Sequence, residues 1–548
     1  MKVKMKKIFI PIVSAIIAAL SFTGCQKTFM TEITGQGDQK SQGQEQTVVP
    51  DDEISTILRS IKGVSDVEIV LFSGQTKAND GKEVLKQYFF NYAQPLDHSK
   101  AGISTFKQRV AIQMVNPGNP VVVNTQGYEM EMDGTRYYQN DLCETLSANL
   151  VEIEYRYFGA SQPESMNNVE FNYLSSEQAA EDIHAVVEML KKNIFKNNTW
   201  VATGVSKGGI TSALQAYYSD KKGWKDFDLY VPFCAPFFTG TPDSPTDRSI
   251  GRYIVYNCGA GYPAGSVEAK GYENLRKILI QSINKPVLRE ALLRRFHNDD
   301  ASLYTYKEIL HQYNPVTEGI LLCGIIQSYL EATLLRFADC PFSSWANLIP
   351  NPDNIKDDAV EEDPALQAVV EFVFLDEKNF KLLVDLSSMM ETKSTHTESD
   401  MIFQRKDPRY DLAYNVLSVR ELGCVGMDYS WIPEDSFITE EMAKSVEDDA
   451  CGRAFGMDYY EGQWDGGKLM TDFRKWVATE NTQKIVFVYC SDDPWTSGAV
   501  DDASAEANPL IVKVMNKNGI HEDCFLESHL YTKEARDKIV NAVTTFLK

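Results

Sequence analysis

A glycine-rich hexapeptide, GVSKGG at residues 204–209, places a serine where it could act as a nucleophile. Glycines two positions before and after Ser206 are typical of a strand-to-helix turn that is too tight for side chains and that exposes the serine hydroxyl. An apolar run, TWVATG, ends at this motif, and an amphipathic run, GITSALQAYYSD, begins there. A purely structural turn could carry the same glycines, so the motif predicts a nucleophile only if a base and an acid are available.

Two aspartates and two histidines near the end of the chain could complete a triad in the order Ser, Asp, His, which is typical of α/β-hydrolases. The apolar run KIVFVYC leads directly into Asp492 and Asp493. A second strand-like run, DCFLES, precedes His529, whereas His521 stands in front of that run. Because parallel sheets build their sites at the carboxyl ends of strands, we predict His529 as the base and expect His521 at the opposite edge.

An oxyanion hole requires two backbone N–H groups that point at the tetrahedral intermediate. Lys207 follows the serine directly, so we predict that its N–H supplies one of them. The loop that follows an early apolar run, VVVNTQGYEM, is predicted to supply the other through the N–H of Gly127 or of Tyr128. An ordinary glycine turn is the alternative interpretation of this loop.

Strand-like and helix-like segments alternate from about residue 117 to residue 240. Strands are predicted at 117–124, 148–158, 199–204 and 227–237, and a capped amphipathic helix is predicted at 175–194. This alternation predicts a parallel sheet with helices on both faces. From 240 to 470 the pattern is mainly helical, and the α/β pattern then returns. We therefore predict an α/β-hydrolase core formed by residues 51–239 and 471–548, with a helical cap inserted at 240–470.

The N-terminus has the pattern of an export signal. Four lysines precede an apolar run and then small residues and Cys25, which is typical of a cleaved signal and not of a spanning helix. The ending FTGC resembles a bacterial lipobox, so residues 1–25 are predicted to be a lipoprotein signal peptide with Cys25 as the lipidated residue. Residues 26–50 are rich in Gln, Gly, Ser and Thr and predict a flexible tether. We expect an exported bacterial lipoprotein of the cell envelope that contacts the membrane only through its lipid; a plain secreted protein is the alternative.

The net charge of the chain restricts the kinds of molecule that we expect to bind it. The chain has 54 Lys and Arg against 77 Asp and Glu, which gives a formal net charge of −23 at pH 7. Such an acidic protein repels phosphate backbones, so we expect no nucleic-acid partner, whereas a cationic ligand such as a peptide amino terminus is favoured. The sequence contains no HExxH or CxxC motif, and we expect no metal and no cofactor.

Seven motifs occur together from about residue 85 to the end of the chain. They are YAQPLDH (92–98), FKQRV (106–110), NTQGY (124–128), EYRYFGAS (154–161), GVSKGG (204–209), RELGCVGMD (420–428) and DDPW (492–495). Together they resemble the prolyl tripeptidyl aminopeptidase family of secreted serine peptidases, which is related to the lysosomal Pro-X carboxypeptidase and dipeptidyl peptidase group. The resemblance implies Ser206 as nucleophile, Asp493 as acid and His529 as base. The first aspartate of DDPW is commonly asparagine in that pattern, which favours Asp493 over Asp492.

The resemblance also implies release of short peptides from a free N-terminus, often after proline, with the helical insertion roofing the site. An exopeptidase of this kind must bind the substrate ammonium, and a carboxylate is the natural partner. Glu421 is our candidate for this carboxylate, and pairing with Arg420 or Arg156 is the structural alternative. Trp495 is expected either to form a wall of the substrate pocket or to pack against the acid loop.

The motifs are compatible with more than one class of substrate. Tyr155 stands where the relatives often carry histidine, and Cys424 stands where an aromatic residue is usual, and both positions bear on substrate preference. An esterase or lipase on the same fold would need the same triad, because acyl transfer to serine serves esters and amides alike. A non-catalytic lipoprotein that binds peptides or glycans is a third hypothesis, which the complete set of Ser, Asp and His disfavours.

Overall fold

A computed structural model describes residues 49–72, 85–134, 138, 140–163, 171–239, 250–298, 342–373, 413–414, 416–423, 431–433, 436, 439 and 465–548. The predicted signal peptide with Cys25, nearly all of the predicted tether, and Cys424 lie outside these residues. Within the described part of the chain, no helix combines the length and the apolarity that crossing a membrane would need.

A nine-stranded sheet forms the centre of the molecule, in the order β1-β2-β3-β5-β4-β6-β7-β8-β9. The strands are β1 Val64–Phe72, β2 Leu85–Pro95, β3 Thr105–Met114, β4 Val121–Thr125, β5 Asn149–Ile153, β6 Trp200–Val205, β7 Leu229–Phe233, β8 Ile485–Cys490 and β9 Ile511–Asn516. The pairs from β1 to β5 are antiparallel, and the pairs from β5 through β4 to β9 are parallel. The predicted α/β-hydrolase core is confirmed.

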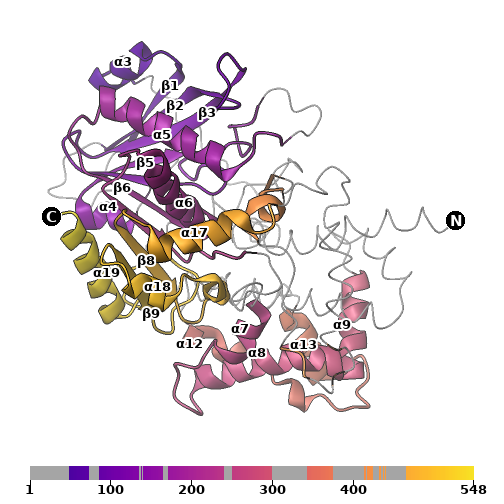
Figure 1. The fold of residues 1–548 in the computed structure, drawn as a ribbon. Helices are drawn as coiled ribbons and strands as arrows, with labels where there is room; N and C mark the ends of the chain where they lie inside the picture. Colours follow the sequence, from indigo (N-terminus) through magenta and orange to yellow (C-terminus); the bar gives the residue numbers. More distant parts are fainter. Residues whose placement is uncertain are drawn as a thin grey trace.

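Helices cover both faces of this sheet (Figure 1). Residues of α3 (Glu53–Ser60), α5 (Ser176–Asn193), α6 (Lys207–Lys222), α17 (Lys468–Thr479) and α18 (Asp502–Glu506) belong to one buried apolar cluster. Residues of α4 (Asp141–Leu146) and α19 (Lys533–Phe546) belong to the cluster on the other face. Strands β4 to β8 have buried residues almost throughout, as expected for parallel strands that are covered on both faces.

Local signals explain where the long helix α5 begins and ends. Its N-cap residue, Ser175, accepts a hydrogen bond from the Gln178 N–H, and Lys191 and Lys192 stand in the last turn, near the negative end of the helix dipole. The helix predicted at 175–194 therefore agrees with the structure within one residue at each end.

Further helices lie between β7 and β8 in the chain and gather beside the sheet (Figure 1). They are α7 Ile250–Tyr256, α8 Val267–Asn284, α9 Pro286–Asn298, α12 Phe342–Trp345, η2 Ala346–Leu348, η3 Pro352–Asn354 and α13 Pro364–Val373. A further short helix of this part of the chain, η5 Ser418–Leu422, instead contacts α17. The Tyr253 hydroxyl donates to the Ser491 carbonyl at 3.0 Å, which connects α7 to the loop after β8.

The last strand differs from our expectation. The run DCFLES, residues 523–528, is not a strand: its backbone forms turns, with the Glu527 N–H bonded to the Cys524 carbonyl. Its apolar character comes from core packing, because the Phe525 ring stacks on Phe233 with centroids 5.9 Å apart. The strand that pairs with β8 is the preceding run IVKVMN, which forms β9.

Candidate active site

Ser206 occupies the strained turn between β6 and α6. Its backbone has φ 57° and ψ −121°, a conformation that side-chain-bearing residues rarely adopt and that costs about 1–3 kcal/mol. Its N–H donates to the Phe233 carbonyl at 2.9 Å, which holds the turn against β7. A Cβ at Gly204 would lie 2.5 Å from the Gly208 carbonyl carbon. The predicted reason for the glycines is therefore confirmed: the turn has no room for side chains.

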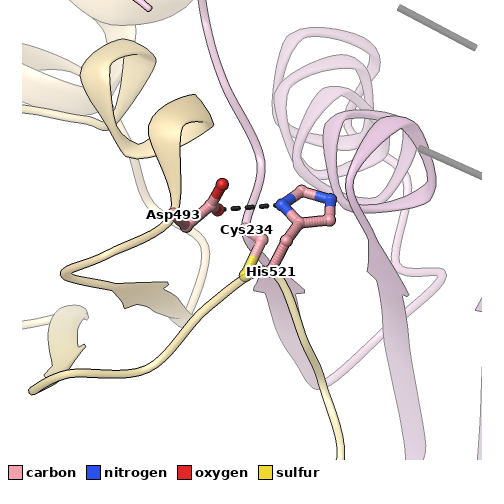
Figure 2. Close-up of side chains that lie close together, drawn as sticks. All are labelled: Cys234, Asp493 and His521. Carbon is pink, nitrogen blue, oxygen red and sulfur yellow. Dashed lines mark hydrogen bonds and ion pairs between the residues drawn. The ribbon is translucent and has the colours of Figure 1, made fainter. Parts of the chain in front are cut away.

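Asp493 forms a buried pair with His521 (Figure 2). One carboxylate oxygen, Oδ2, lies 2.8 Å from Nδ1 of His521, and the other accepts the Trp495 N–H at 3.0 Å. Asp493 comes directly after the short loop that follows β8, and His521 follows β9. Because β8 and β9 are parallel neighbours, their carboxyl ends bring the two side chains together.

The expected pairing of Asp493 with His529 is therefore wrong. The reason is the position of the last strand: since β9 ends at Asn516, the first histidine beyond its carboxyl end is His521 and not His529. His529 lies in a turn before α19, is partly exposed, and has Nδ1 3.8 Å from the Glu527 carboxylate. A histidine does follow the last strand of the sheet, but that strand is β9 and not the run DCFLES.

Backbone contacts connect the Asp493–His521 pair to Ser206. The Phe233 carbonyl accepts the Ser206 N–H, and the next residue, Cys234, is buried beside the pair (Figure 2). Its sulfur and the nearest ligand atoms of Asp493 and His521 all lie within 4.8 Å of one another. Atoms of these types can bind zinc, although the carboxylate already engages Nδ1 of the imidazole. Ser206, Cys234, Asp493 and His521 thus all lie at the edge of the sheet where the carboxyl ends of β6 to β9 meet.

The second ring nitrogen of His521, Nε2, is buried, and within the described part of the chain it has no hydrogen-bond partner. A buried polar atom without a partner is costly and calls for an explanation, such as a catalytic role. Nε2 of His529 is in the same state among the described residues, so the bond to Asp493 is what distinguishes His521. An ionised carboxylate only accepts hydrogen bonds, so Nδ1 carries the proton and Nε2 is the basic nitrogen. This arrangement can take a proton from a hydroxyl group.

Asp492 has different partners from Asp493. Its Oδ1 accepts the Gly259 N–H at 3.0 Å, and Gly259 follows α7. Burial raises the pKa of Asp492 from its usual value of 3.8 to about 6. The two adjacent aspartates therefore have different partners: Asp493 holds a histidine, and Asp492 ties the helical insertion to the end of β8.

The predicted oxyanion loop packs directly on the nucleophile turn. A Cβ added to Gly127 would lie 2.8 Å from the Gly208 nitrogen and 2.8 Å from Cβ of Lys207. The Thr125 hydroxyl donates to the carbonyls of Thr203 and Gly208, which pins the loop to both sides of the turn. Gly127 and Lys207 are thus brought together as expected.

The predicted ammonium ligand, Glu421, contacts the start of α5. Its Oε2 accepts the Ser176 N–H at 2.7 Å, and burial raises the pKa of the carboxyl. Of the two arginines, Arg156 donates to both carboxylate oxygens of Asp182. Arg420 donates to the carbonyls of Phe171 and Leu174, and its charge opposes the effect of burial on the pKa of Glu421. Glu421 therefore has a helix-capping contact, and its role toward a substrate ammonium stays a prediction.

Trp495 is buried, with its ring 6.0 Å from that of Phe238 between centroids. Its N–H bond to Asp493 makes it part of the acid loop, which is one of the two expected arrangements.

A strand pattern that could have pointed to His521 is present in the sequence. The run IVKVMN is rich in β-branched and apolar residues and lies between Asn508-Pro509 and the turn residues Lys517-Asn518-Gly519, which is a strand pattern. The buried side chain of Lys207 was missed altogether, because its contacts come from residues far away in the chain.

One protein-family model matches the first part of the chain. Residues 53–269 match the model of the PS-10 peptidase S37 family. This segment contains Ser206, the oxyanion loop and most of the sheet.

Two characterised relatives match shorter segments. A prolyl tri/tetrapeptidyl aminopeptidase of Streptomyces mobaraensis is 34% identical over 134 residues, which are 24% of this chain and 26% of that enzyme. The human lysosomal Pro-X carboxypeptidase is 38% identical over 79 residues, which are 13% of this chain and 16% of that enzyme. The chain thus matches about a quarter of the first relative's length and about a sixth of the second's. The expected resemblance to prolyl peptidases is confirmed.

A solved structure that resembles the fold is the peroxisomal α/β-hydrolase of Saccharomyces cerevisiae. It is 8% identical, with a TM-score of 0.33, and the alignment covers 85% of this chain and 90% of that one.

Proposed function

With the match to the PS-10 peptidase S37 family as the premise, we propose that this chain is a serine peptidase that acts through an acyl-enzyme. His521 Nε2 takes the proton of the Ser206 hydroxyl while Oγ attacks the scissile carbonyl carbon. The tetrahedral intermediate collapses, the C–N bond breaks, and the protonated imidazole gives its proton to the leaving amine. A water molecule then attacks the acyl-enzyme with His521 again as base, which releases the acid and restores Ser206.

One observation carries this proposal: the buried Asp493–His521 pair, with its basic nitrogen unpartnered within the described residues, and the strained serine turn stand at the same edge of the sheet. Asp493 fixes the tautomer and stabilises the imidazolium that forms during attack. The backbone N–H of Lys207 and one N–H of the loop at Gly127 stabilise the oxyanion. Each required role thus has a residue at the same edge of the sheet.

The proposed substrate is a peptide with a free N-terminus, from which a short fragment, of tripeptidyl type, is released after proline. This specificity is supported by the name of the Streptomyces relative, a prolyl tri/tetrapeptidyl aminopeptidase. The formal charge of −23 favours approach of a cationic N-terminus. Glu421 is the proposed ammonium ligand, for which Glu421→Gln should raise KM for free peptides and leave KM for N-acylated substrates unchanged.

Active-site labelling followed by a substrate panel tests the proposal. A fluorophosphonate probe should modify Ser206 in the folded protein, and His521→Ala should abolish the adduct. The panel compares Ala-Ala-Pro-p-nitroanilide, its N-succinyl form, a peptide ending in Pro-X, and a p-nitrophenyl ester. Hydrolysis of the free tripeptidyl anilide, with weak action on the other three, is the expected result.

The other outcomes are equally informative. A preference for the ester would favour an esterase, and cleavage of the C-terminal residue from the Pro-X peptide would favour a carboxypeptidase. Absence of any adduct on folded protein would refute the serine mechanism and favour a non-catalytic binding protein.

We also propose that the chain is exported and anchored through a lipid on Cys25. The lysine-rich start, the apolar run and the lipobox-like FTGC support this proposal. Mass spectrometry of the N-terminal peptide should find a diacylglyceryl group on Cys25, and Cys25→Ser should release the protein from the membrane fraction. An unmodified mature N-terminus at another residue would contradict it.

A further inference from the structure

The side chain of Lys207 turns away from the solvent and runs beneath the oxyanion loop. Only 3% of this residue is exposed, although it carries an ammonium group. Its Nζ donates a hydrogen bond to the carbonyl oxygen of Gly127. The same residue that offers its own backbone N–H to the oxyanion hole therefore also contacts the loop that supplies the second donor.

Three aromatic rings surround the ammonium group. Nζ lies 3.6 Å from the centroid of the Tyr155 ring and 5.4 Å from the centroids of Tyr128 and Phe158. Aromatic faces attract cations, and the attraction is stronger where water is excluded. The rings also brace one another, since Phe158 meets Tyr128 and Tyr155 edge to face at 5.7 and 5.8 Å. This arrangement holds the ammonium at one position.

The direction of the Gly127 carbonyl determines the direction of the next N–H. The peptide bond between Gly127 and Tyr128 is trans and planar, so its C=O and N–H point in opposite directions. Because the carbonyl is directed to Lys207, the Tyr128 N–H is directed away from the buried ammonium.

We propose that Lys207 is a positioning residue that holds the Gly127–Tyr128 peptide in the orientation in which the Tyr128 N–H is the second oxyanion donor. This inference rests on the proposed peptidase function. Glycine leaves the neighbouring peptide free to rotate, so the loop needs an external restraint. A rotated peptide would place the Gly127 carbonyl where the oxyanion forms, and the like partial charges would repel each other.

The experiment compares Lys207→Met with wild type and with a matched control, Lys191→Met. Lys191 is also a lysine that contacts a ring, Trp200, and donates to a carbonyl, that of Lys225, but it lies at the far end of α5. Lys207→Met should lower kcat for the peptide anilide by about 100- to 1000-fold, the usual effect of losing one oxyanion donor. KM should change less than about threefold, and the affinity for a peptide boronate, which mimics the tetrahedral intermediate, should fall as much as kcat. Lys191→Met should match wild type.

A second variant keeps the test valid if Lys207→Met does not fold. Tyr155→Leu retains the lysine but removes the nearest ring, and it should lower kcat and boronate affinity in parallel by about tenfold with KM unchanged. Wild-type kcat and boronate affinity in a folded Lys207→Met, or in Tyr155→Leu, would overturn the inference alone. A wild-type protein that neither hydrolyses the anilide nor reacts with the fluorophosphonate would overturn the proposed function, and this inference with it.

Discussion

The Asp493 carboxylate lies 2.8 Å from Nδ1 of His521, and both side chains are buried at the carboxyl ends of neighbouring strands. The carboxylate also accepts the Trp495 N–H, which restrains its rotation away from the ring. This contact leaves Nε2 as the basic nitrogen of the imidazole. The chemistry that we propose for the chain depends on this pair.

Replacing each of the two late histidines separates their roles. His521→Ala should lower kcat by about 10⁴-fold or more, because it removes the base and leaves only the oxyanion hole and substrate binding. His529→Ala should keep kcat within about threefold, because His529 contacts Glu527 and not the acid. Steady-state hydrolysis of the peptide anilide measures both. The reverse ranking would restore His529 as the base.

Replacing each of the two adjacent aspartates, Asp492 and Asp493, separates their effects on activity. Asp493→Asn should lower kcat by about 10⁴-fold, because an amide in place of the carboxylate favours the wrong imidazole tautomer. Asp492→Asn should retain most activity, because the amide oxygen can still accept the Gly259 N–H. Equal losses in the two variants would mean that the acid loop acts as a unit and that the assignment of Asp493 is unsupported.

The buried carboxyl of Asp492 should make folding stability depend on pH. Its folded pKa is about 6 against a usual value of 3.8, so the folded state binds the proton more tightly than the unfolded state. The resulting stabilisation is complete below about pH 4 and is lost as the pH rises through 6. Asp492→Asn is neutral at every pH and should therefore be more stable than wild type at pH 8, by up to about 3 kcal/mol, with the difference disappearing near pH 4.

Urea denaturation at pH 4 and pH 8 measures this difference. Asp353→Asn is the control of opposite sign, because its ion pair with Lys277 lowers the pKa of Asp353, and this variant should gain no stability at pH 8. An Asp492→Asn variant no more stable than wild type at pH 8 would contradict the raised pKa.

The strained backbone at Ser206 should lower the free energy of unfolding of the active protein by a measurable amount. Ser206→Gly relieves an unfavourable backbone conformation, partly offset by the greater freedom of glycine in the unfolded chain, and should raise the free energy of unfolding by about 1 kcal/mol. Ser206→Ala keeps a Cβ and should gain nothing from this source. Both variants should be inactive. If Ser206→Ala were as stabilised as Ser206→Gly, strain at this position would not be the cause.

The close approach of Gly127 to the nucleophile turn predicts a specific loss. Gly127→Ala places a methyl group 2.8 Å from the Gly208 nitrogen, so the loop must move and one oxyanion donor with it. We expect kcat to fall by about 100- to 1000-fold while KM changes much less. Gly118→Ala is the control, because among the described residues a Cβ there would meet just the Asn116 side chain, at 3.4 Å. An active Gly127→Ala would mean that the oxyanion hole lies elsewhere.

The sequence by itself determined the nucleophile turn and most of the parallel sheet. Both depend on local physics: glycines permit the tight turn at Ser206, and continuous apolar runs form strands that are buried on both faces. The same reasoning placed Asp492 and Asp493 together at the end of the buried strand formed by KIVFVYC, and the family resemblance favoured Asp493 of the two. The antiparallel strands β1 to β3 were not predicted.

Only the tertiary structure decided which histidine meets Asp493. The runs IVKVMN and DCFLES are both apolar enough to be strands, and what separates them is that one pairs with β8 while the other packs as turns beneath Phe233. The contact between Lys207 and Gly127 is equally non-local, since it joins residues 80 positions apart. Hydrogen bonding between strands and burial of a long side chain are decided by partners that are distant in the chain, and for this reason local patterns alone did not predict them.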